Sequence, residues 1–248
     1  MVSIVDELSE IMFNTLMISA DDPNEWVEIA NKWTLSTQGL LQESADIDIV
    51  KISIILLGAF GFDDYEYSKR RLINMSLYGG FTLYSILALS RLANTSSILN
   101  PEQPIQLNDL VFSIAKSVDG WGRVHAVEHL EPADDEIKRW LLEHGCEGGV
   151  LDMYIALNCA VKGDLFSVLK QKTLDENLLK GITRVFEGLL YADINIGGGI
   201  NAYEHGKEAL SLYVQHAKSR HEHLSDRVTD LLLALTAKEM LEYKQGEE

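Results

Sequence analysis

Apolar residues recur at helical spacing in almost every segment of this 248-residue chain. Val5, Leu8, Met12 and Leu16 follow this spacing near the amino terminus, after a start signal formed by Ser3 and Asp6. The segment 46–60 also suits a strand, because it is rich in β-branched residues, but no partner strand is evident elsewhere. We therefore predict an all-α protein. The further helices are expected at about 64–77, 81–94, 106–118, 121–131, 133–144, 149–162, 175–191, 200–218 and 222–244.

Short connections marked by glycine and proline separate these predicted helices. They are Gly79-Gly80, Pro101 to Pro104, Pro132, Gly145, Gly148-Gly149, Gly163 and Gly197-Gly198-Gly199. Around a dozen helices joined in this way are buried most simply as stacked antiparallel hairpins, which form an α-α superhelix or solenoid. We expect one α-helical repeat domain over residues 1–248. Its parts are acidic helices in 1–45, a repeat segment over 46–218 and a C-terminal helix at 222–244.

Several stretches of the chain resemble the degenerate helical repeats of HEAT and armadillo-like proteins, and are most similar to bacterial members of that superfamily. They are KISIILLGAF, FTLYSILAL, DGWGRVHAVEHL, EIKRWLLEHGC and MYIALNCAVKGDL. The resemblance implies a binding surface or scaffold. It also suggests that Trp121 and Trp140 seal a helix hairpin across the turn at Pro132, and that Arg123 pairs with an acid on a neighbouring helix. Ligand contacts by Trp121, Gly122 and Arg123 are the alternative, and Glu128 is a further candidate binding residue.

The net charge of −17 is concentrated at the amino terminus, where residues 1–48 hold ten acids and one base, Lys32. A field of this sign repels phosphate backbones, so nucleic acid is excluded as a partner. It attracts a basic protein, and the candidate contacts are Asp6, Glu10, Glu25 and Glu28. The alternative is that this negative charge serves only to keep the protein soluble. The HEAT-like DNA glycosylases need a basic face and are therefore disfavoured.

The two cysteines, Cys146 and Cys159, are expected to be buried thiols of a reducing compartment, since they form no C-x-x-C pair. The first residues lack the pattern of a signal peptide. The longest apolar stretch, Ile52–Phe62, is shorter than the roughly 20 residues of a membrane span. We therefore expect a cytoplasmic protein without a membrane partner.

The string HAVEH matches the inverted zinc-protease pattern H-x-x-E-H, with His125 and His129 on one face of a helix and Glu128 beside them. The two histidines are expected to lie opposite an apolar arc and to face solvent, without the dry pocket that a catalytic metal needs. That arc is formed by Trp121, Val124, Val127 and Leu130. Candidates for a third ligand are His144, Glu187 and His205. A metal-dependent hydrolase is therefore the alternative function.

The other candidate motifs are incomplete. The run NIGGGINAYEHGKEA has Asn201 and Glu208 where a phosphate loop needs glycine and Ser or Thr, so we expect a close turn between helices. His221 and His223 diverge on a helix. We assign no catalytic residue, metal or cofactor. The predicted function is a non-enzymatic protein-binding or scaffold protein, for example an immunity-type or regulatory partner of a basic protein.

Overall fold

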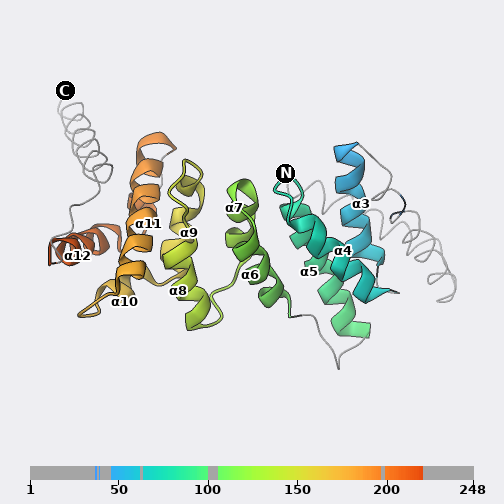
Figure 1. The fold of residues 1–248 in the computed structure, drawn as a ribbon, viewed down its shortest axis with the longest axis horizontal. Coiled ribbons are helices and arrows are strands. Elements are labelled where there is room, and N and C mark those ends of the chain that lie inside the picture. Colours follow the sequence, from blue (N-terminus) through green and yellow to red (C-terminus); the bar gives the residue numbers. More distant parts are fainter. Residues whose placement is uncertain are drawn as a thin grey trace. The chain divides into compact units, whose positions relative to one another are not determined.

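The computed structural model describes Thr37, Gly39 and residues 46–61, 64–99, 106–196 and 199–219. These residues form ten α-helices and one 3₁₀ helix, without a strand among them (Figure 1). The all-α prediction is confirmed for this part of the chain, and the ambiguous segment 46–60 is a helix. The helices expected near the amino terminus and at 222–244 lie outside the described residues.

The chain divides into two compact units, Met1–His129 and Leu130–Glu248, which we call unit 1 and unit 2. The single repeat domain stays a prediction. None of the described helices combines the length and the apolar character needed to cross a membrane.

Unit 1 is built around α5, against which α3 and α4 pack. Helix α3 begins at Asp46, whose carboxylate accepts hydrogen bonds from the backbone of the first turn and caps the helix. Helices α3 and α5 approach closely because Gly58 has no side chain to hold Ala88 away. The described elements are α3 (Ile47–Phe60), α4 (Tyr65–Ser76), α5 (Thr82–Leu99), α6 (Leu107–Ser117) and α7 (Gly120–His129).

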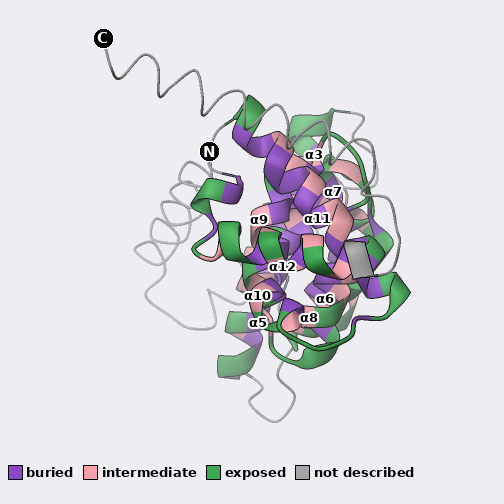
Figure 2. Cartoon of the chain, turned by 90° about the vertical axis from the view of Figure 1, so that its left-hand side faces the viewer, coloured by how far each residue is buried: buried purple, intermediate pink, exposed green. Residues whose placement is uncertain are grey.

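Unit 2 is built around α11, which packs against α8 and α9. Gly181 brings α11 onto the end of α8, and Gly188 brings it onto α9 at Ala156. The rings of Phe186 and Tyr213 meet in the core, with centroids 4.7 Å apart. Figure 2 shows the buried residues on the helix faces that turn toward neighbouring helices. The elements are α8 (Asp135–His144), α9 (Asp152–Lys162), α10 (Leu165–Leu169), α11 (Glu176–Asn195), η1 (Ile200–Ala202) and α12 (Gly206–Ser219).

Two details of unit 2 differ from the sequence prediction. Helix α10 was not expected, because its five residues are too short to show a periodic pattern. The helix expected over 200–218 is split into η1 and α12 by the turn at Tyr203–His205. Gly206 permits this break, since a Cβ there would lie 2.1 Å from the Ile200 carbonyl oxygen.

Both cysteines are free and buried, as predicted. A hydrogen bond with Cys159 and then burial raise the pKa of the Cys146 thiol well above its ordinary value. The protonated thiol is the favoured form there, which agrees with the position of Cys146 in the core.

Candidate functional site

Helix α7 leaves α6 through a corner of two residues, Val118 and Asp119. Its first residue, Gly120, has φ 54°, a left-handed conformation that favours glycine. The guanidinium of Arg123 closes the corner, because its Nε donates to the Val118 carbonyl oxygen at 2.9 Å. Arg123 therefore supports the local backbone. Its expected pairing with an acid on another helix stays a prediction.

The first turn of α7 lies against the turn that joins α4 to α5. A Cβ at Gly122 would be 2.9 Å from Thr82 Oγ1 and 3.4 Å from Gly79 Cα. The Thr82 hydroxyl donates to the Ser76 carbonyl oxygen at 2.7 Å and so fastens the connecting turn. The small residues Gly79 and Gly122 thus bring the turn 77–81 beside the start of α7.

Three large apolar residues of these two segments are exposed. Leu77 is 48% exposed, Tyr78 64% and Trp121 49%. Tyr78 directly precedes Gly79, Leu77 precedes Tyr78, and Trp121 directly precedes Gly122, so all three lie close in sequence to the backbone contact. We call these three residues the aromatic edge. Exposed large apolar residues on adjoining segments are candidates for an interaction site.

The burial of Trp121 corrects the sequence prediction, which placed this residue in the apolar arc of α7. The residues that face the rest of unit 1 are Val124, Val127 and the small residues Gly122 and Ala126. Small residues allow backbones to approach closely, so they determine which face of α7 turns inward. The inward face is rotated toward Gly122, and the indole of Trp121 is carried outward.

The opposite face of α7 presents Trp121, His125 and Glu128, which are spaced i, i+4 and i+7. The rings of Trp121 and His125 stack, with centroids 6.0 Å apart. Trp121 and Glu128, both predicted as binding residues, therefore lie on one face with a histidine between them. Whether they bind a partner stays a prediction.

His125 is half-buried, not exposed as expected. Its Nδ1 is buried and has no hydrogen-bond partner among the described residues, and Glu128 Oε2 is 3.7 Å away. Burial lowers the pKa of His125 below its ordinary value, and the Glu128 carboxylate opposes this shift. The neutral imidazole is therefore favoured at neutral pH.

His129 is engaged by the helix backbone, since its Nδ1 lies 2.9 Å from the His125 carbonyl oxygen. A metal held by both histidines would have to use their Nε2 atoms. In the part of the chain that the structure describes, no group of three or more His, Cys, Asp or Glu side chains is arranged to hold a metal ion. The hydrolase based on His125, Glu128 and His129 stays a prediction.

Two other regions named from the sequence can be placed. The glycine-rich run contains a close turn: the buried carboxylate of Asp193 accepts from Gly199 N at 2.9 Å and from the Asn201 side chain at 3.0 Å. This agrees with the expected structural role.

The acidic candidates Asp6, Glu10, Glu25 and Glu28 lie outside the described residues.

Sequence reasoning missed Leu77 and Tyr78 as site residues. The available signal was the pair of large apolar residues directly before Gly79-Gly80, a position where a turn is expected and burial is difficult. That signal does not predict that Trp121 lies close to Tyr78, because Trp121 is 43 positions further along the chain.

Comparisons with protein-family models, with curated proteins and with solved structures find no match to this chain. The resemblance to HEAT and armadillo-like repeats therefore stays a prediction from the sequence.

Proposed function

We propose that this chain is a non-enzymatic protein-binding protein whose partner is a basic protein, as in immunity-type or regulatory pairs. The observation that carries this proposal is the aromatic edge. It consists of an indole, a phenol and a leucine side chain, each about half exposed or more, carried by two segments of unit 1 whose backbones meet at Gly79 and Gly122.

The chemistry of the aromatic edge suits a cationic partner. Tryptophan and tyrosine are enriched among the residues that dominate binding energy at protein interfaces. The faces of their rings attract arginine and lysine side chains. The exposed carboxylates of Asp119 and Glu128 lie before and within α7 and add negative charge. A partner that presents arginine or lysine beside apolar groups would satisfy both features.

We further propose that the helices form an α-solenoid, as the sequence suggests. The support is the order of packing within each unit, where most partners are one or two helices apart along the chain. In unit 1, α5 packs on α3, α4 and α7; in unit 2, α9 packs on α8 and α11. Local packing of this kind is typical of repeat proteins, in which each repeat contacts its neighbours.

The proposal is tested by capture from the native host with the full chain as bait, comparing the parent with Trp121→Ala and Tyr78→Ala. Ile98→Ala is the matched control, because Ile98 is 79% exposed on α5 of the same unit but lies outside the aromatic edge. The captured protein is then purified and its affinity for each variant measured. We expect one basic protein, bound roughly 30-fold more weakly by Trp121→Ala and equally by the control. Unchanged affinity of both aromatic variants would contradict the proposal.

A further inference from the structure

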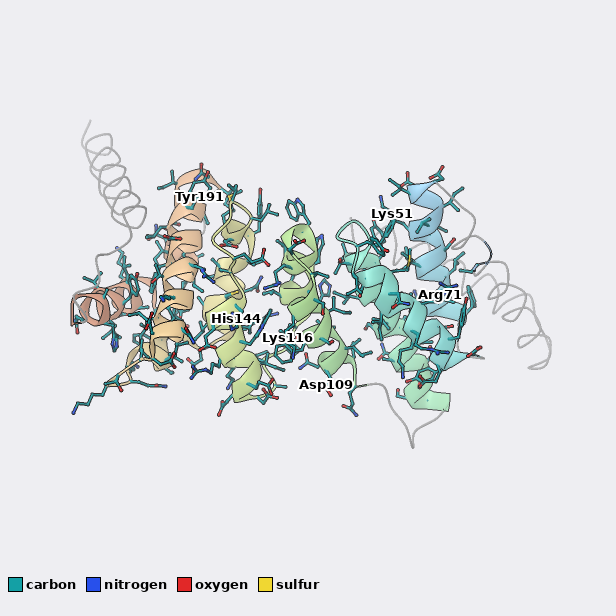
Figure 3. The ribbon with its side chains drawn as sticks, viewed as in Figure 1. Lys51, Arg71, Asp109, Lys116, His144 and Tyr191 are labelled. Atoms are coloured by element: carbon teal, nitrogen blue, oxygen red, sulfur yellow. The ribbon has the colours of Figure 1, made fainter. Side chains whose placement is uncertain are left out.

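Unit 2 contains an open pocket with a volume of about 340 Å³, at the lower end of the range for sites that bind small ligands. It lies beside α8 and α10 and the start of α11. Its lining residues are Asp135, Lys138, Arg139, Leu142, Gly163, Asp164, Ser167, Val168, Gln171 and Leu178. Figure 3 shows the side chains around α8, where His144 marks the end of that helix.

The pocket combines an apolar floor with a polar rim. Leu142 and Leu178 are buried beneath the pocket, and Val168 is half-buried, so Val168 offers the apolar surface that a ligand can contact. Ser167 and Gln171 are exposed at the rim, where they offer neutral hydrogen-bonding groups. An apolar base below a few polar groups is the usual construction of a site for a small ligand.

The two cations of the pocket are already engaged by carboxylates. The Arg139 guanidinium contacts Asp175 Oδ2 at 2.6 Å and Glu143 Oε1 at 2.5 Å, and these hydrogen bonds raise its pKa. Lys138 Nζ lies 4.0 Å from Asp135 Oδ1. A ligand anion would therefore have to compete with carboxylates that belong to the protein.

Asp164 is the carboxylate of the pocket that forms no ion pair with a basic side chain of the described residues. It precedes α10 but makes no side-chain capping hydrogen bond, and no ion pair in the described part of the chain includes it. Its backbone is left-handed, with φ 52°. Glycine or asparagine adopts this conformation more readily than aspartate does, so the carboxylate can be removed without harm to the turn. Asp164 therefore offers the pocket a carboxylate that can pair with a cationic ligand.

We propose that this pocket binds an ammonium or guanidinium group carried on an aliphatic stem. The cationic group pairs with Asp164, and with Asp135 when Lys138 moves aside. The stem lies on Val168, and the Ser167 hydroxyl and the Gln171 amide oxygen accept the remaining N–H groups. This site is independent of the aromatic edge, and its proposal does not rest on the proposed function.

Isothermal titration of the full chain with agmatine tests the proposal, with N-butylurea as a neutral analogue of similar shape. We expect saturable binding of agmatine and none of the urea. A blocked Ala-Arg-Ala tripeptide is the second arm. Tighter binding of agmatine identifies a free amine as the ligand, and tighter binding of the tripeptide identifies a protein side chain. If neither cation binds, the proposal is wrong.

Two substitutions with opposite expected effects make the test specific. Asp164→Asn keeps the shape and the backbone conformation but removes the charge, so affinity should fall about tenfold with an unchanged Tm. Lys138→Met frees Asp135 and should raise affinity about threefold. The control is Asp109→Asn, which makes the same charge change at the start of α6 and is not among the residues that line the pocket. Reversed signs would indicate an anion site and overturn the proposal.

Discussion

The aromatic edge of unit 1 and the pocket of unit 2 differ in the chemistry that they expose to solvent. At the edge, Gly122 allows the backbones to approach so closely that Trp121 is directed outward, and apolar area stays in contact with water. At the pocket, apolar groups are covered, and the carboxylate of Asp164 has no cation of its own in the described part of the chain. Close packing at Gly122 therefore leaves apolar surface exposed in unit 1, whereas the pocket of unit 2 leaves a carboxylate without an ion pair among the described residues.

Both regions depend on glycine at helix contacts, and replacing these glycines tests that dependence. In unit 2 a Cβ at Gly181 would lie 2.3 Å from the Leu142 carbonyl oxygen and 2.4 Å from Glu143 Cα. Because these are backbone atoms, α8 and α11 must separate. We expect Gly181→Ala to destabilise the protein by about 3 kcal/mol in thermal unfolding. Gly149→Ala is the control, since a Cβ there meets no atom of the described residues within 4 Å; equal stability of both variants would contradict this packing.

A smaller loss is expected at the aromatic edge. A Cβ at Gly122 meets Thr82 Oγ1 at 2.9 Å, a side-chain atom, and Val118 Cβ at 3.1 Å. Gly122→Ala should cost about 1–2 kcal/mol and move Trp121, which near-ultraviolet circular dichroism and tryptophan fluorescence can detect. Gly80→Ala, in the adjoining turn, meets nothing within 4 Å and should change neither signal. An unchanged indole environment in Gly122→Ala would show that this contact does not position the edge.

The sequence predicted much of this fold and less of the candidate site. Helical spacing identified most of the described helices, because burial of one helix face leaves a periodic trace. The same spacing assigned Trp121 to the wrong face, since it counted large apolar residues and ignored the packing of Gly122 and Ala126. Leu77 and Tyr78, and the pocket around Asp164, depend on contacts between segments far apart in sequence, for which periodicity carries no information.

Asp175 connects the start of α11 to α8. Its carboxylate accepts from Leu178 N at 3.0 Å, which caps α11, and it pairs with Arg139. These hydrogen bonds lower the pKa of Asp175. Its stabilising contribution is therefore present at neutral pH and is lost as the pH falls through the lowered folded value, below the ordinary aspartate range.

Asp175→Ala should accordingly cost about 1 kcal/mol at pH 7 through the lost cap. Asp175→Asn keeps an acceptor and should cost less, because the ion pair is exposed and screened by solvent. Chemical denaturation at pH 7 and at pH 4 measures both losses. A loss that grows as the pH falls would contradict the lowered pKa of this carboxyl group.

The smallest effect is expected from His125 on the outer face of α7. Its pKa is lowered chiefly by burial, raised by Glu128 and lowered again by His129, so the folded state favours the neutral ring. Stability should fall slightly as the pH drops from the ordinary histidine value of 6.5 toward the lowered folded value. His125→Gln should flatten the dependence of Tm on pH between 7.5 and 5.5. A steeper profile in the variant would show that the charged ring is the stabilised form.

Metal analysis separates the two functions considered for this helix. The proposed function needs no metal, whereas the alternative hydrolase requires His125 and His129 to hold zinc. We expect purified protein dialysed against zinc to retain none at stoichiometric level. Stoichiometric zinc that is lost in His125→Ala would favour the hydrolase instead.

Site-specific photo-crosslinking in the native host tests the docking role of the aromatic edge most directly. A benzoylphenylalanine replaces Tyr78 in one variant and Ile98 in the other, so both positions carry the same exposed aromatic probe in unit 1. We expect an adduct with one basic protein from position 78 and none from position 98. No adduct from position 78, or the same adducts from both positions, would contradict it.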